Sequence, residues 1–280
     1  MKKRIESLLI AMAKHDVFWK FLRPLSTVGK ILAHSRWAHE KEKRMAKSSK
    51  YESLFHSLTV LNGPFQGLKY PSLESVGSAL YPKLLGSYER ELHPTLRKIA
   101  DEVYSEILDI GCAEGYYAIG LARKYARAQV HAFDVEKKAR NLCLQMAKLN
   151  GVADRLEIHS ACSKEFLKTF VFTQKGLILC DCEGFENELF GMENINNLNN
   201  CDLIIEVHDF IDIEISSRLK RLFSKSHSIE SVYSLDDIHK AQTYDFHELS
   251  NLSLKDKMSL LSEHRPAIME WIVCKPKKSI

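Results

Sequence analysis

Long hydrophobic runs are absent from this 280-residue sequence. Its longest apolar stretches, such as SLLIAMA from Ser7, are far shorter than the roughly 20 residues that a membrane-spanning helix needs. The basic start, MKKR, leads into a short apolar run that carries Glu6 and has no clear small-residue cleavage site, so we expect no signal peptide. A composition of 45% hydrophobic and 27% charged residues is that of an ordinary globular protein, and we expect a cytoplasmic one.

Cysteine pairs with metal-binding spacing are also missing. The seven cysteines are an odd number, and Cys180 and Cys182 lack the spacing of a zinc-binding pair. Most of the seven lie in or beside predicted strands. They therefore indicate reduced core thiols of a cytosolic protein rather than a disulfide framework or a structural zinc site.

The stretch EILDIGCAEGYYAIGLA, residues 106–122, lacks two common nucleotide-binding fingerprints. It has no Gly-Lys-Ser/Thr of a P-loop, and Ala113 stands where a dinucleotide-binding turn has its second glycine. What it does contain is a short apolar strand, a turn through Gly111 and Gly115, and a helical pattern from Tyr116. A unit of this kind places a ligand at the carboxyl end of the strand.

Strand and helix patterns alternate from Tyr104 onward. Seven strands are predicted, at 106–110, 129–134, 156–160, 177–181, 203–208, 229–233 and 268–274, with helical runs between them. This alternation predicts an α/β fold with a seven-stranded, doubly wound, Rossmann-like sheet.

The region before this sheet has a different composition. Residues 1–50 hold 13 Lys or Arg against 4 Asp or Glu, whereas the remaining 230 hold 27 against 32. We interpret residues 1–57 as helical, forming an amphipathic cap or a partner helix. A helix lying on an anionic membrane surface is the alternative, because Lys and Arg lie beside Phe and Trp. Basic charge without recognition motifs does not predict nucleic-acid binding.

A hairpin and a helix are predicted between the basic region and the first strand. Residues 59–61 and 68–70 are strand-like around an Asn-Gly-Pro turn, and residues 83–100 have a helical pattern. We therefore predict an N-terminal helical and hairpin extension at 1–73 and a Rossmann-like domain at 74–280.

Acidic residues follow several of the predicted strands. Asp134 ends the second strand, roughly 20 residues after the glycine turn, where a carboxylate accepts hydrogen bonds from ribose hydroxyls. Glu136 is a weaker substitute. Asp181 and Glu183 alternate at the end of the fourth strand. Burying unpaired carboxylates in a sheet is costly, which indicates a functional rim rather than packing.

The fifth strand also ends in polar residues. Glu206 and His208 point to one face and Asp209 to the other, because side chains alternate along a strand. Parallel neighbouring strands would therefore bring Glu206 and His208 to the same rim as Asp181 and Glu183.

These motifs carry a resemblance. The turn DIGCAEG resembles the first motif of the Rossmann-type S-adenosylmethionine (SAM)-dependent methyltransferases. The pattern D-x-E-G-x-E-x-x-L-x-G, together with a later E-x-H, resembles the FkbM-type methyltransferases across residues 104–210. In this sequence the two patterns are Asp181, Glu183, Gly184, Glu186, Leu189, Gly191, Glu206 and His208.

The resemblance implies a SAM cofactor and the residues that would contact it. Members mostly methylate hydroxyl or carboxyl oxygens of sugars and natural products. Many methyltransferases place a helix over the cofactor, so Glu89 or Glu91 is a candidate contact, although a solvated helix face is the simpler interpretation. The implied contacts are Asp109, Gly111, Cys112, Ala113, Gly115, Tyr116, Asp134, Val135, Ala161, Cys162, Asp181 and Glu89.

The sequence departs from the family at several points. Cys112, Ala113 and Glu114 stand where members often have Ala-Asn-x, and Asp134 stands where most have Glu. The family does not predict the segments around the hairpin, so the substrate is not carried over.

The chemistry of methyl transfer to oxygen assigns roles to the rim residues. The protein must position the acceptor oxygen and remove its proton. His208 is the first choice for general base, because its usual pKa of about 6.5 lies near neutrality, and Asp181 is the second. Glu206 would act beside them. Two alternatives stay open: pairing of Glu206 with His208 for structure only, and a divalent metal held by Asp181, Glu183, Glu206 and His208.

The predicted function is O-methylation of a small-molecule or glycan acceptor with SAM; no metal and no nucleic-acid partner is predicted, and a homodimer is left open. One alternative is an enzyme that transfers or cyclises another part of SAM, and a second is a SAM-binding partner subunit without turnover. Glu263, His264 and Arg265 are weaker candidates for the pocket mouth.

Overall fold

The computed structural model describes residues 29, 32, 35–36, 51 and 54–277. Contacts divide the chain into one unit of residues 1–51 and a second unit of residues 52–280. Most of the predicted basic helical region therefore lies outside the described residues, and its role stays a prediction. The division falls at 51/52 rather than at the predicted 73/74.

The second unit is built on a seven-stranded sheet in the order β3-β2-β1-β4-β5-β7-β6. Strands β1 to β5 pair in parallel, whereas β7 is antiparallel to both of its neighbours. This confirms the predicted doubly wound, Rossmann-like sheet. The strands are β1 (Glu106–Ile110), β2 (Gln129–Phe133), β3 (Leu156–His159), β4 (Gly176–Cys180), β5 (Cys201–Val207), β6 (His227–Tyr233) and β7 (Glu270–Pro276).

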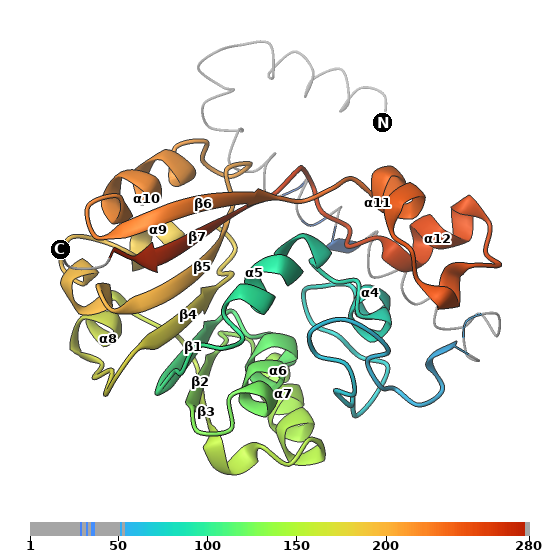
Figure 1. Cartoon of the computed structure of the whole chain (residues 1–280), viewed down its shortest axis with the longest axis horizontal. Coiled ribbons are helices and arrows are strands. Elements are labelled where there is room, and N and C mark those ends of the chain that lie inside the picture. Colours follow the sequence, from blue (N-terminus) through green and yellow to red (C-terminus); the bar gives the residue numbers. More distant parts are fainter. Residues whose placement is uncertain (1–28, 30–31, 33–34, 37–50, 52–53, 278–280) are drawn as a thin grey trace, which may run out of the picture. The chain divides into compact units, whose positions relative to one another are not determined.

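Helices cover both faces of the sheet (Figure 1). Helices α6 (Tyr116–Lys124) and α7 (Lys137–Leu149) pack on β1, β2 and β3. Helices α8 (Lys164–Thr169), α9 (Glu186–Leu189) and α10 (Ile215–Phe223) enclose the other face. Every residue of β1, β4 and β5 is buried, because a parallel sheet covered on both sides has no solvent face.

The segment before β1 differs from its prediction. The expected helix over 83–100 is broken into α4 (Leu80–Leu85), a 3₁₀ turn (Arg90–Leu92) and α5 (His93–Lys98). Gly86 ends α4 in a left-handed conformation with φ of 82°, and a Cβ there would lie 2.0 Å from the Asn62 carbonyl oxygen. A tertiary contact therefore overrides the local helical pattern.

The predicted hairpin forms around one antiparallel bridge, between Thr59 and Lys69. The Leu61 amide also donates to the Leu84 carbonyl at 2.8 Å. The hairpin is thereby joined to α4, which explains why the boundary between units does not fall at residue 73.

Helices α11 (Asp237–Thr243) and α12 (Leu254–Leu261) follow β6 in the chain, and α12 contacts both α11 and α4. Short 3₁₀ turns lie before β3 at Ala153–Arg155, before β5 at Ile195–Leu198 and after α11 at His247–Leu249.

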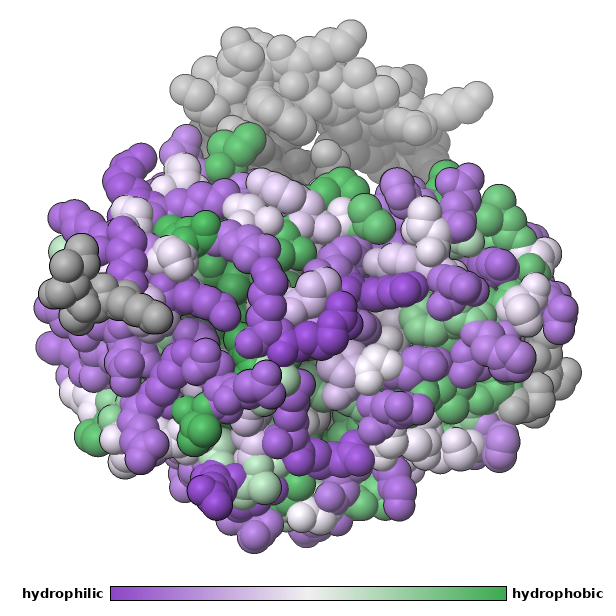
Figure 2. Space-filling model, in the orientation of Figure 1, coloured by the Kyte–Doolittle hydropathy of each residue, from purple (hydrophilic) through white to green (hydrophobic). Residues whose placement is uncertain are grey.

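The face in Figure 2 is mostly hydrophilic over the described part of the chain, with hydrophobic residues in small groups between polar ones. Among the described residues, no helix combines the length and apolar character needed to cross a membrane.

Candidate active site

A pocket of about 460 Å³ opens at the carboxyl ends of β1, β2, β3 and β4. The strand order reverses between β1 and β4, which is where open α/β sheets bind their ligands. The turn after each of these strands contributes to the wall. The lining residues are Val76, Gly77, Ser78, Ile110, Gly111, Ala113, Phe133, Asp134, Val135, Glu136, Ser160, Ala161, Cys162, Asp181, Cys182, Glu183, Phe185 and Leu189.

The charges in this lining all have one sign. Asp134, Glu136, Asp181 and Glu183 contribute carboxyl groups, and no described lysine or arginine lines the pocket. Opposite charges attract and like charges repel, so the pocket favours a ligand with positive charge over a pyrophosphate. This agrees with the missing dinucleotide and P-loop fingerprints.

The turn after β1 fixes the geometry of the pocket. Gly111 has φ of 87°, and a Cβ there would lie only 1.7 Å from the Asp181 carbonyl oxygen. Only glycine lets β1 and β4 approach so closely. The Ala113 amide donates to Asp134 Oδ2 at 2.8 Å, and the Glu136 amide donates to Oδ1 at 2.8 Å. The Asp134 carboxylate is thereby held in the pocket wall.

The structure places the predicted cofactor contacts in two groups. Seven of them lie in the pocket wall: Gly111, Ala113, Asp134, Val135, Ala161, Cys162 and Asp181. The other five are buried and do not line the pocket: Asp109, Cys112, Gly115, Tyr116 and Glu89.

Two residues of the second group show what lies behind the wall. Asp109 is 1% exposed, its Oδ2 atom has no hydrogen-bond partner among the described residues, and burial raises its pKa to about 7. Tyr116 packs edge-on against Phe65 and Tyr88. Tyr116 therefore belongs to the core around α6.

His208 lies among three carboxylates. Its Nδ1 atom is 2.7 Å from Glu186, and its Nε2 atom is 3.5 Å from both Asp181 and Glu183. Burial alone would lower the pKa of His208, but the hydrogen bond to Glu186 and the charge of Asp181 raise it to about 9. The imidazole is therefore protonated at neutral pH, which is the wrong state for a general base.

Asp181, unlike His208, has a pKa near neutrality. Burial raises its pKa to about 7, against the pull of the His208 charge. Its side chain is 32% exposed, because it lines the pocket. A carboxyl group that titrates near neutrality and faces a pocket suits proton transfer.

Glu206 points away from this group. It forms an ion pair with Arg265, which also contacts Glu89 Oε1 at 2.7 Å and Glu263 Oε2 at 2.8 Å. Burial raises the pKa of Glu89 to about 7 and that of Glu206 to about 8. The guanidinium group lies 4.6 Å from the centre of the Trp271 ring, which completes its enclosure. We call Arg265 and its three carboxylate partners the Arg265 cluster.

The Arg265 cluster adjoins the pocket. A small space is lined by Glu89 and Glu206 of the cluster and by Asp181, which also lines the pocket. Lys240 of α11 extends the cluster through Glu263, at 2.6 Å. From the sequence, Arg265 was only a weak candidate for the pocket mouth and Lys240 was not a candidate, because no motif marks them.

Glu114 is a further residue that the sequence did not assign to the site. It is 2% exposed and pairs with Lys83 at 2.6 Å. It also accepts hydrogen bonds from the Ser75 hydroxyl at 3.0 Å and the Val76 amide at 3.2 Å. Glu114 thereby fixes the segment 76–78 that forms one pocket wall. In the sequence, the position of Glu114 inside the glycine turn could have indicated this role.

Two groups of described residues have the geometry to hold a metal ion. The first, Asp181, Glu183 and His208, comprises three of the four residues of the metal site that was left open as an alternative, and Glu206 is not part of it. The second group consists of His131, Glu157 and His159, which lie on β2 and β3.

No protein-family model matches the chain, and no curated protein matches it. The fold is similar to several solved structures. The O-methyltransferase TomG from Streptomyces achromogenes, involved in tomaymycin synthesis and solved with SAM, is 13% identical, with 69% of this chain and 81% of that chain covered and a TM-score of 0.46. An rRNA methylase from Streptococcus thermophilus is 14% identical, with 67% and 97% covered and a TM-score of 0.44. TrmK from M. capricolum, solved with S-adenosyl-homocysteine, is 14% identical, with 66% and 68% covered and a TM-score of 0.39.

At these identities the likeness concerns the fold alone. The described unit has a seven-stranded, Rossmann-like α/β architecture. Which activity this chain has is a separate question, and it depends on its own pocket.

Proposed function

We propose that this chain is a SAM-dependent methyltransferase. The observation that carries the proposal is the acidic pocket at the reversal of strand order, with four carboxyl groups in its wall. SAM is a nucleoside with a positive sulfonium and a positive ammonium group, so it complements this charge. When bound, it supplies a methyl group already activated for transfer.

The pocket residues fit the parts of such a ligand. Asp134 is fixed by two backbone amides and keeps unused acceptor positions on both oxygens for ribose hydroxyls. Val135 is 79% exposed at the pocket wall and offers an apolar surface to a base. Gly111 lines the same wall as Asp181, where we place the amino-acid part. Asp109, buried behind this wall, keeps one carboxyl oxygen without a partner among the described residues.

We further propose that Asp181, rather than His208, takes the proton of the acceptor. With a pKa of about 7, Asp181 is partly ionised at neutral pH, whereas His208, with a pKa of about 9, is positively charged. His208 then acts as a positioning residue that holds Asp181 by charge. The sequence analysis ranked His208 before Asp181 as general base, and this assignment reverses that ranking.

The resemblance to the FkbM-type family supports an oxygen acceptor on a sugar, a glycan or another natural product. The acidic lining supports a small molecule over RNA, because phosphate groups would be repelled. O-methylation of such an acceptor is the finer part of the proposal.

A metal-assisted version of the same reaction is favoured by one observation. His208 Nε2 faces Asp181 and Glu183 while its Nδ1 contacts the Glu186 carboxylate. Metal-binding histidines are commonly oriented by a carboxylate in this way. Turnover that stops after exhaustive chelation and returns with a divalent cation would support the metal-assisted version.

The test is incubation of the full chain with SAM and a panel of sugar and natural-product acceptors. We expect S-adenosylhomocysteine and a product heavier by one methylene group, seen by mass spectrometry. A different mass gain would indicate transfer of another part of SAM. SAM binding without turnover of any acceptor would favour a non-catalytic subunit.

The proton acceptor is tested with Asp181→Asn, and Glu230→Gln, outside the pocket, serves as its control. The first should lower kcat about 10²–10⁴-fold, the usual contribution of a general base. The control should remain near wild type, because the Glu230 side chain is 58% exposed on β6 and does not line the pocket. In the wild type, kcat should rise with pH through about 7, since the base must be ionised; a rise centred near 9 would instead point to His208.

A further inference from the structure

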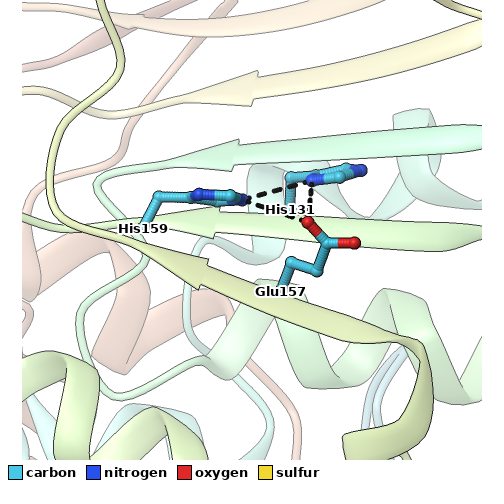
Figure 3. Close-up of side chains that lie close together, drawn as sticks. All are labelled: His131, Glu157 and His159. Atoms are coloured by element: carbon cyan, nitrogen blue, oxygen red, sulfur yellow. Dashed lines mark hydrogen bonds and ion pairs between the residues drawn. The ribbon is translucent and has the colours of Figure 1, made fainter.

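Two histidines and a glutamate meet on the outer two strands of the sheet, outside the pocket. His131 of β2 lies directly opposite Glu157 of β3 in the strand register. His159 lies two residues after Glu157, so both side chains leave the same face of β3. Figure 3 shows the three side chains converging, with the Glu157 carboxylate beside both rings. We propose that His131, Glu157 and His159 bind a divalent transition-metal ion such as Zn²⁺.

The distances suit such an ion. His131 Nδ1 lies 3.2 Å from His159 Nε2 and 3.5 Å from Glu157 Oε2, and His159 Nε2 lies 3.8 Å from the same oxygen. Ligand atoms at about 2.0–2.1 Å from a tetrahedral zinc ion are roughly 3.3 Å apart. The three atoms therefore already form a triangle close to one face of that tetrahedron, and small rotations of the exposed Glu157 side chain would close it.

The donor set selects the type of metal. Two imidazole nitrogens and one carboxylate oxygen suit Zn²⁺ and its first-row neighbours, whereas Mg²⁺ and Ca²⁺ take oxygen ligands. The Glu157 side chain is 57% exposed and that of His159 is 32% exposed, so an ion reaches the site from solvent. The fourth position is left for water.

Neighbouring side chains hold the ligands in place. The His159 ring stacks on Phe133 with centroids 4.6 Å apart, and the edge of Phe170 meets His131 at 4.9 Å. The Gln129 side chain donates to Glu157 Oε1 at 3.4 Å, which leaves Oε2 for the metal. Supporting contacts of this kind orient metal ligands and strengthen binding. Phe133 also lines the pocket, so the two sites are neighbours with separate ligands.

The experiment uses the full chain without a histidine tag, stripped of metal with a chelator. Calorimetric titration with Zn²⁺ should show binding that Mg²⁺ does not compete for. His159→Asn and Glu157→Gln should each weaken it at least about 10–100-fold, since loss of a supporting group alone has this effect. Both side chains are partly exposed, and circular dichroism checks that the variants fold.

Glu183→Gln is the matched control, because it alters the other metal-capable group. It should leave the binding assigned to His131, Glu157 and His159 unchanged. Titration with Co²⁺ gives a second readout, since a tetrahedral site gives a strong visible absorption that His159→Asn should abolish. The proposal is overturned if Zn²⁺ binding is absent, if it survives in both His159→Asn and Glu157→Gln, or if Glu183→Gln alone removes it.

Discussion

Replacing Glu186 by Gln is expected to lower the pKa of His208 from about 9 to about 6.5 or below. Glu186 is fully buried, and its Oε1 atom lies 2.7 Å from His208 Nδ1. Burial by itself lowers the pKa of His208, and Glu186 is the chief group that opposes it. Without that carboxylate, burial should dominate.

The difference between the usual value of 6.5 and about 9 corresponds to about 3 kcal/mol in favour of the imidazolium. The folded-state pKa of His208 lies above the unfolded one. This residue therefore stabilises the fold fully below about pH 6.5, and the contribution is lost as pH rises through about 9. In the Glu186→Gln variant, this contribution to the free energy of unfolding should be missing, so it cannot be lost between pH 6.5 and pH 9.

Two measurements check this expectation, both in the presence of a chelator. NMR of the imidazole signals follows the titration of His208 directly. Urea unfolding at pH 6.5 and pH 9 compares the free energy of unfolding of wild type and variant, and the change between the two pH values should differ by about 3 kcal/mol.

Glu183→Gln is the control, because Glu183 lies 3.5 Å from the other ring nitrogen but its side chain is 75% exposed. Solvent screens such a charge, so this variant should change the pKa little. The reasoning would be refuted if His208 of the wild type titrated near 6.5, or if the two Glu→Gln variants lowered its pKa equally.

Two further variants test the packing behind the pocket. Arg265→Met should lower the free energy of unfolding by about 3–5 kcal/mol, because it leaves buried carboxylates unpaired, and the loss should shrink at low pH as Glu89 takes up a proton. Arg218→Met, at an exposed ion pair, should cost less than about 1 kcal/mol in the same urea assay. Gly111→Ala should lower the melting temperature far more than Gly151→Ala, since both have positive φ but only Gly111 has an atom within 4 Å of the added Cβ; equal effects would contradict the proposed close approach of β1 and β4.

The strands β1, β2 and β4 were predictable from the sequence because each is a short, largely apolar run followed by glycine or an acidic residue. The run at 106–110 has the bounds of β1, and the run at 177–181 is shifted by one residue from β4. The insertion of β7 between β5 and β6 was not predictable, since strand order depends on contacts that no local pattern encodes. The prediction of one continuous helix over 83–100 was wrong for a similar reason, because the close contact with Asn62 determines the conformation of Gly86.

The pocket wall was predictable because the carboxyl ends of parallel strands meet at one edge of the sheet. Asp134 and Asp181 reached the pocket on that argument alone. The Arg265 cluster was not predictable, since Arg265 and Glu89 are 176 residues apart in the sequence and belong to no shared motif. Sequence spacing also placed Glu206 with His208, but a long-range ion pair holds it elsewhere.

The most direct measurement is calorimetric titration of the full chain with SAM. We expect one molecule bound per chain, with clearly weaker binding for Asp134→Asn and nearly unchanged binding for Glu230→Gln, which lies outside the pocket. Absence of any SAM binding, or equal affinity in wild type and Asp134→Asn, would contradict the assignment of the acidic pocket to this cofactor.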